Sequence, residues 1–155
     1  MKEVVELLII KNKTIATMES CTGGGIVNEI TNIPGASDVL KYSAVTYSNE
    51  FKIKMGVKEE TISKYTVYSS NVANEMSKAI SDFTLSDYGV GVTGKLKRFD
   101  KNNLTGDDSL VFISIYDRNN NKYYEEKIHV NEYSRVDNKQ EVINIVASLM
   151  LKILK

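Results

Sequence analysis

Residues Thr14–Ile30 have the sequence TIATMESCTGGGIVNEI, and this stretch decides the fold. Its first part, Thr14–Met18, is short, apolar and partly β-branched, which predicts a buried strand. Cys21–Gly25 consists of small and flexible residues that favour a tight turn. The apolar residues of Ile26–Ile30 follow at helical spacing. Strand, turn and helix in this order open an α/β unit, so we predict an α/β domain.

Hydrophobic periodicity predicts further elements on both sides of this stretch. Expected helices span Lys2–Ile10, Ser48–Met55, Glu59–Tyr65, a segment capped by Ser69 or Ser70, and about Ser134–Leu154. Expected strands span Tyr42–Tyr47, Tyr88–Thr93, Ser109–Asp117 and Lys122–Val130. An asparagine-rich turn joins the last two strands into an antiparallel hairpin. The predicted fold is a single-domain three-layer α/β/α sandwich over residues 1–155, with a mixed sheet that includes this hairpin.

The balance of charge limits the class of partner. The chain has 155 residues, with 20 basic and 20 acidic side chains. Proteins that bind duplex nucleic acid usually carry a basic excess that neutralises phosphates. Because this chain has no such excess, we expect no nucleic-acid partner. A small polar or phosphorylated ligand fits better.

The chain has one cysteine and one histidine. A single cysteine excludes an intramolecular disulfide, and this count disfavours a zinc site of the usual nitrogen and sulfur ligands. In Met1–Lys13 a short apolar run is interrupted by Glu3 and Glu6, and nothing that resembles a cleavage site follows. We therefore expect neither a signal peptide nor a membrane span, and a cytoplasmic location.

The glycine-rich turn Cys21–Gly25 allows two interpretations. Backbone N–H groups at the start of the following helix favour an anion, or the oxyanion of an acyl-transfer intermediate. The alternative is a helix N-cap at Ser20 or Thr22 combined with tight packing of the helix on the strand. The turn is neither a Walker A loop, since no Lys-Ser/Thr follows the glycines, nor G-x-G-x-x-G.

Cys21 and Ser37 could each be a nucleophile, and each also has an interpretation that involves no catalysis. Cys21 would have a lowered pKa at a helix N-terminus, and His129 is the histidine that could pair with it, but burial as a small apolar residue suits Cys21 better. Ser37 follows the Pro34-Gly35 break, and Lys52 could serve as its base if burial lowered the lysine pKa. Spacing alone does not pair Ser37 with Lys52, and both could simply be solvated.

A basic run follows the strand that ends near Gly94. Lys95-Leu96-Lys97-Arg98 opens a polar loop that extends to Asp108. These cations could hold a phosphate group, although basic residues in a loop are commonly just solvated.

Several motifs follow one another over about the first two-thirds of the chain. They are Ala16-Thr17-Met18-Glu19-Ser20-Cys21-Thr22-Gly23-Gly24, Ile33-Pro34-Gly35-Ala36-Ser37, Val45-Thr46-Tyr47-Ser48-Asn49-Glu50-Phe51-Lys52, Gly56-Val57, and Val67-Tyr68-Ser69 through Glu75-Met76. In order and spacing, these motifs closely resemble the CinA C-terminal domain family, which includes PncC-type nicotinamide mononucleotide deamidases.

This resemblance implies hydrolysis of a carboxamide to a carboxylate and ammonia, with no metal or other cofactor. It places the nucleophile at Ser37 and the base at Lys52. It implies that substrate is bound by Ser20, Thr22, Gly23, Gly24, Tyr47, Thr93 and Arg135. The substrate would be a small mononucleotide, and relatives of this family suggest a homo-oligomer.

The loop after Gly94 departs from the family pattern. Active members have Ile-Ala-Gly-Pro, a glycine-rich stretch and Lys-Pro-Val-Gly in this region, whereas this chain has bulky charged residues from Lys95 to Asp108. Two hypotheses follow. The first is an amidohydrolase that acts on nicotinamide mononucleotide or a related pyridine carboxamide. The second is a catalytically silent nucleotide-binding or regulatory domain that keeps the fold.

Overall fold

A five-stranded mixed sheet forms the middle layer of the protein in the computed structural model, which describes residues 1–131 and 134–155. The spatial order of the strands is β2-β1-β3-β4-β5. Their bounds are β1 Ile15–Glu19, β2 Leu40–Val45, β3 Tyr88–Gly94, β4 Leu110–Asp117 and β5 Lys122–His129. The pairs β2–β1 and β1–β3 are parallel, whereas β3–β4 and β4–β5 are antiparallel. The mixed sheet and its antiparallel hairpin are therefore confirmed.

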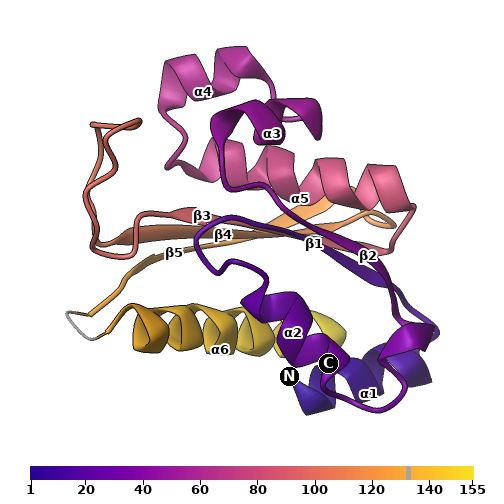
Figure 1. Cartoon of the computed structure of the whole chain (residues 1–155). Coiled ribbons are helices and arrows are strands. Elements are labelled where there is room, and N and C mark those ends of the chain that lie inside the picture. The colour runs from indigo at the N-terminus through magenta and orange to yellow at the C-terminus, as the bar shows by residue number, and fades with distance from the viewer. Residues whose placement is uncertain (132–133) are drawn as a thin grey trace.

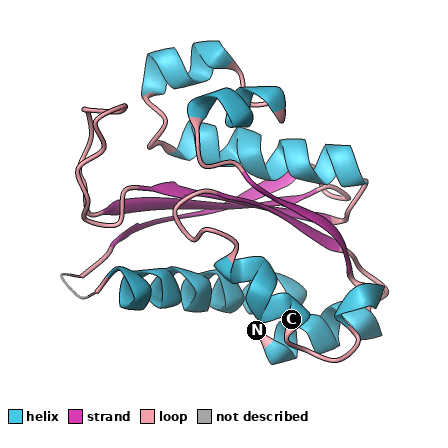
Figure 2. Cartoon of the chain, viewed as in Figure 1, coloured by secondary structure: helices cyan, strands magenta, loops and turns pink. Residues whose placement is uncertain are grey.

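Helices cover both faces of the sheet and complete three layers (Figures 1 and 2). One face carries α1 Lys2–Ile10, α2 Gly25–Thr31 and α6 Arg135–Leu154. The other face carries α3 Asn49–Lys54, α4 Glu59–Tyr65 and α5 Ser70–Thr84. A short 3-10 helix, Ala36–Asp38, lies between α2 and β2. None of the helices in the described residues combines the length and apolar character needed to cross a membrane.

Apolar side chains fill the space on both faces of the sheet. The larger cluster packs α1, α2 and α6 against the sheet, with Leu8, Ile26 and Val146 among its fully buried members. A smaller cluster under α5 includes Met18 and Met76. β1 is buried along its whole length, because helices cover both faces of the sheet.

The helix α5 approaches β3 closely because two strand positions are glycine. A Cβ at Gly91 would lie 2.3 Å from the Ala73 carbonyl oxygen, and one at Gly89 would lie 1.9 Å from the Ser77 carbonyl oxygen. The buried Thr93 hydroxyl donates to the Val67 carbonyl oxygen at 3.0 Å, just before α5 begins. These contacts fix the segment before α5 at the carboxyl end of β3.

The boundary of β2 differs from the one expected from the sequence. The strand begins at Leu40 and ends at Val45, because the Thr46 N–H donates to the Glu19 carbonyl oxygen and the chain then turns into α3. Ser48 caps α3 by accepting a hydrogen bond from the Phe51 N–H. The exposed Tyr47 therefore stands at the edge of the sheet rather than inside a strand.

Candidate functional site

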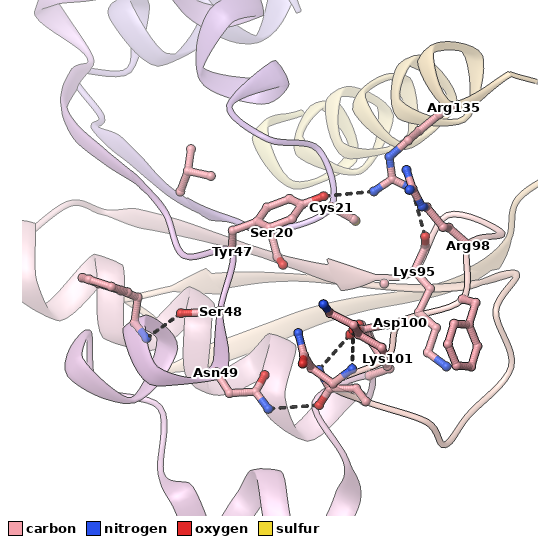
Figure 3. A pocket seen from close by; sticks show the side chains of 17 residues that line it. Ser20, Cys21, Tyr47, Ser48, Asn49, Lys95, Arg98, Asp100, Lys101 and Arg135 are labelled. Carbon is pink, nitrogen blue, oxygen red and sulfur yellow. Dashed lines mark hydrogen bonds between the residues drawn. The ribbon is translucent and has the colours of Figure 1, made fainter.

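The carboxyl ends of the three parallel strands meet at one edge of the sheet. Ser20 follows β1, Thr46 follows β2 and Lys95 follows β3. A cavity of about 1170 Å³ opens at this edge, between α3, the first part of the β3–β4 loop and the start of α6 (Figure 3). Ligands of open α/β sheets commonly bind beyond the carboxyl ends of the strands. This cavity is therefore the candidate site.

A serine and a buried lysine lie together at the base of this cavity. The Lys52 Nζ donates to the Ser20 Oγ at 3.1 Å and to the Thr46 carbonyl oxygen at 2.8 Å. The lysine side chain comes from α3 and is only 2% exposed. Ser20 lines the cavity, so its hydroxyl lies between the amine and the space that a ligand would occupy.

Burial changes the acidity of the lysine. It lowers the pKa of Lys52 to about 8, although the negative charges of Asp100 and of an ionised Cys21 would raise it. At pH 7 about a tenth of the molecules then carry a neutral amine, far more than for a solvated lysine. An amine at this distance from a hydroxyl has the geometry of a general base beside its nucleophile.

The carboxylate of Glu19 occupies the N-terminus of α2. It accepts hydrogen bonds from the N–H groups of Gly24, Ile26 and Val27 at 3.1, 3.0 and 2.8 Å. The hydroxyl of Thr22 donates to the same carboxylate at 2.7 Å. The prediction that these N–H groups bind an external anion is therefore wrong, because an internal anion already holds them. The expected cap at Ser20 or Thr22 is wrong for the same reason.

The thiol of Cys21 lies beside Ser20 and is buried. Burial raises the pKa of this thiol to about 12, against the opposing effect of Arg135. A thiol with this pKa stays protonated near neutral pH and is a poor nucleophile. The interpretation of Cys21 as a buried small residue is the better one.

An arginine and a tyrosine form one side of the cavity. The Arg135 guanidinium, from the first turn of α6, donates to the Tyr47 hydroxyl and to the Lys95 carbonyl oxygen, each at 3.1 Å. Figure 3 shows the Tyr47 ring between Ser20 and this guanidinium. Ser134 caps α6 by accepting from the Asp137 N–H, which fixes the helix start that carries Arg135.

The β3–β4 loop forms the opposite wall and is tied to its surroundings. The buried Lys95 amine pairs with the Asp108 carboxylate at 2.8 Å. Tyr68, before α5, donates to the Asp100 carboxylate at 2.5 Å. Asn49, at the start of α3, donates to the Asn103 side-chain oxygen at 3.0 Å. The loop therefore has a defined course across the cavity.

Ser37 lies away from this site, and its expected pairing with Lys52 does not occur in the structure. It is an exposed residue of the 3-10 helix that precedes β2, whereas Lys52 follows the carboxyl end of β2. The neighbouring Gly35 is close to Ile9 of α1, at the other end of the sheet. The six residues of β2 lie between Ser37 and Lys52 in the chain, and a strand of this length spans roughly 20 Å.

The other residues that the sequence assigned to substrate binding divide into two groups. Ser20, Tyr47 and Arg135 line the cavity. The hydroxyls of Thr22 and Thr93 are turned inward, to Glu19 and to the Val67 carbonyl oxygen. The glycines Gly23 and Gly24 shape the turn with positive φ values of 63° and 90° and do not line the cavity.

Sequence reasoning missed Tyr68, Asn49 and Asp100, which link the loop to α3 and to the segment before α5. Their contacts span more than 30 residues of sequence, so no local pattern could have paired them. One signal was available for Asn49, which directly follows the helix cap Ser48 and therefore had to lie beside Lys52.

A second polar cluster lies at the end of the loop. The Ser109 hydroxyl contacts the His129 Nδ1 at 2.9 Å and the Asp107 carboxylate at 2.7 Å, while His129 is well exposed. The aspartate and the serine thus meet the same ring nitrogen, which is not the relay geometry of a catalytic triad. Across residues 1–131 and 134–155, no three metal-ligating His, Cys, Asp or Glu side chains come together.

Solved structures of low sequence identity share this fold. A CinA superfamily protein from Escherichia coli superimposes with a TM-score of 0.89 at 18% identity, over 98% of this chain and 87% of the other. A CinA superfamily protein from Klebsiella pneumoniae gives 0.88 at 19% identity, over 97% and 93%. The three-layer α/β/α architecture is therefore confirmed.

Sequence relatives and a family model identify the family. A protein of Clostridium botulinum (strain Langeland), named as competence-damage inducible, is 36% identical over 98% of this chain. The match covers 36% of that protein, so the chain spans about a third of its length. A Clostridium novyi protein of the same name is 47% identical over 57% of this chain and 22% of its own length. The model of the CinA C-terminal domain matches residues 1–154. The chain therefore belongs to the CinA C-terminal domain family.

Proposed function

We propose that this domain hydrolyses a carboxamide to a carboxylate and ammonia, with Ser20 as nucleophile and Lys52 as general base. The observation that carries the proposal is the 3.1 Å contact between the Lys52 Nζ and the Ser20 Oγ at the base of the cavity. A serine hydroxyl becomes a useful nucleophile only when a neighbouring base takes its proton. The lowered pKa of Lys52 supplies that base near neutral pH.

The reaction follows from this pair. Neutral Lys52 accepts the proton of the Ser20 hydroxyl while the Oγ attacks the carboxamide carbon. The Cys21 N–H directly follows the nucleophile, a common position for a donor to the oxyanion. Protonated Lys52 then gives its proton to the departing nitrogen, the C–N bond breaks, and ammonia leaves. Water attacks the acyl-serine ester while Lys52 takes its proton, and Lys52 then gives this proton to the departing Ser20 Oγ as the carboxylate is released.

The lining of the cavity favours a pyridine mononucleotide, and we propose nicotinamide mononucleotide as the substrate. Its pyridinium ring is flat and positively charged, which suits the exposed aromatic rings of Tyr47 and Phe99 in the cavity. Its phosphate requires a cation, and Arg135 stands beside Tyr47. A cavity of about 1170 Å³ has room for a ligand of this size.

The direct test measures ammonia released from nicotinamide mononucleotide. Ser20→Ala and Lys52→Met should each lower kcat by a factor of roughly 10³ or more, because each removes half of the pair. In the wild type, kcat/KM should rise with pH up to about 8, as Lys52 loses its proton.

Ser37→Ala distinguishes the two serines within the same assay. It should keep most of the activity, because the exposed Ser37 lies at the other end of the sheet from Lys52. Loss of activity in Ser37→Ala with full activity in Ser20→Ala would reverse the assignment of the nucleophile.

A second candidate function is a domain that binds the nucleotide without turnover. The observation that favours it is the Glu19 carboxylate, which occupies N–H groups of α2 that could otherwise stabilise an oxyanion. Calorimetric titration with nicotinamide mononucleotide, run beside the ammonia assay, separates the two functions. Binding with no ammonia release supports the silent domain.

A further inference from the structure

The β3–β4 loop turns two cations into the cavity, and the loop carboxylate that lines the same cavity, Asp100, is hydrogen-bonded to other groups. Arg98 and Lys101 line the cavity. Within residues 1–131 and 134–155, neither forms an ion pair or a hydrogen bond with a carboxylate. Uncompensated cations in a concave site attract an anion and raise its local concentration.

The three acidic residues of the loop are already committed to other groups. Asp108 pairs with the buried Lys95 amine. Asp107 accepts from both the hydroxyl and the N–H of Ser109. Asp100 accepts from Tyr68, the Asn103 side chain and the Asn102 N–H. Burial would raise the pKa of the Asp100 carboxyl, but these hydrogen bonds outweigh it and the pKa is lowered. The acids therefore hold the loop in place, and among the described residues none of them pairs with Arg98.

Arg98 stands at the same end of the cavity as Arg135. Figure 3 shows both guanidinium groups directed to this end, one from the loop and one from α6. The Arg135 guanidinium is fixed by its hydrogen bond to the Lys95 carbonyl oxygen, three residues before Arg98. Two like charges that share one end of a cavity repel each other unless an anion lies between them. Guanidinium forks match the oxygens of a phosphate group, which can accept from both.

We propose that Arg98 and Arg135 together bind the phosphate monoester of the substrate, and that Arg98 makes the domain select a phosphorylated pyridine nucleotide over the unphosphorylated riboside. The proposal rests on the proposed function, since it places the substrate's phosphate at the far end of the cavity whose base holds Ser20. Tyr47, between Ser20 and Arg135, marks the position of the pyridine and ribose portion.

The test compares nicotinamide mononucleotide with nicotinamide riboside as substrates of Arg98→Ala. A charge-assisted contact to phosphate predicts a loss of roughly ten- to hundredfold in kcat/KM for the mononucleotide. Activity on the riboside should change by less than about twofold, because the riboside has no phosphate for Arg98 to contact. Arg98→Lys should recover only part of the loss, because an ammonium lacks the planar fork.

Arg118→Ala is the matched control, because it removes the same charge at the opposite edge of the sheet, where the Arg118 guanidinium donates to the Ser81 carbonyl oxygen at 3.2 Å. It should leave the ratio of the two kcat/KM values unchanged. An equal loss on both substrates in Arg98→Ala would assign Arg98 to the folding of the loop and overturn the proposal, as would no loss on either.

A failure of the proposed chemistry remains distinguishable from a failure of this inference. If the wild type releases ammonia from neither compound, calorimetry with the same two compounds measures the preference directly. Tighter binding of the mononucleotide that is lost in Arg98→Ala then supports the phosphate site and removes the hydrolase. Equal binding of the two compounds, or no binding of either, overturns the phosphate site.

Discussion

The position of Lys52 in the fold has an energetic cost, because its charged amine is buried. Its amine is nearly inaccessible to water, and its two neutral hydrogen-bond partners, Ser20 and Thr46, do not balance a positive charge. The folded protein therefore holds the proton of Lys52 less tightly than the unfolded chain does. The arrangement suits a general base, and it destabilises the protein at neutral pH.

Lys52→Met should make the protein more stable at pH 7 while removing the proposed hydrolase activity. The folded pKa of about 8 lies below the ordinary 10.5, so between these values the unfolded chain binds more protons and stability rises with pH. Below about pH 8 the wild type carries the full cost, which is about 3 kcal/mol for this difference in pKa. The gain in Lys52→Met is smaller than this cost, because methionine cannot make the two hydrogen bonds of Lys52. Urea denaturation at pH 7 and at pH 10.5 measures the free energy of unfolding of both proteins.

The control for this experiment is Lys54→Met, which removes an exposed lysine from the same helix. It should change the free energy of unfolding by less than about 0.5 kcal/mol at either pH. A difference in unfolding free energy between Lys52→Met and the wild type that is the same at pH 7 and at pH 10.5 would mean that Lys52 keeps an ordinary pKa.

Sequence reasoning at the residue scale found Lys52 but paired it with the wrong serine. Ser37 is nearer in sequence, yet β2 carries the chain from Ser37 across the sheet to Lys52. Ser20 is 32 residues from Lys52, but both follow the carboxyl ends of adjacent parallel strands. The role of Glu19 as the cap of α2 could not be predicted either, because an acid that ends a buried strand can turn toward solvent or inward.

At the scale of the elements, the contact between α5 and β3 sets where the walls of the site lie. The strand β3 ends at Gly94, directly before Lys95, and the segment before α5 carries Tyr68, so any movement of α5 moves one wall relative to the other. The sequence predicted both elements, since the apolar face of α5 and the apolar strand are clear patterns. It could not predict how closely they approach, because that depends on which side of β3 the helix crosses.

Gly91→Ala should be strongly destabilising, by about 3 kcal/mol, because the new methyl would overlap α5 backbone. Its Cβ would lie 2.3 Å from the Ala73 carbonyl oxygen and 2.6 Å from the Ser77 nitrogen, so the helix must move away. Gly106→Ala is the comparison. There no atom lies within 4 Å, and a φ of +92° should cost only about 1 kcal/mol. Denaturation midpoints measure both, and equal losses would contradict the close approach.

At the scale of the whole molecule, the order of the elements predicted the layers. The early strand-turn-helix unit and the late hairpin together require a sheet with parallel and antiparallel parts, which the strand order β2-β1-β3-β4-β5 confirms. The cavity was not predictable from the same pattern. It is closed by α6 and the β3–β4 loop, which approach through Arg135 and the Lys95 carbonyl oxygen from positions 40 residues apart in sequence.

Cys21 is a natural probe of local opening in the turn between β1 and α2. It is the chain's single cysteine, buried between Ser20, the proposed nucleophile, and the start of α2, with a thiol pKa raised to about 12. A thiol reagent such as Ellman's reagent can therefore react only when this part of the protein opens, and the reaction rate measures the free energy of that opening. Saturating nicotinamide mononucleotide should slow the reaction severalfold in the wild type, since the ligand stabilises the closed state. A rate that equals that of the unfolded chain would mean that the turn around Cys21 is open in solution, and that the serine beside it is not held for attack.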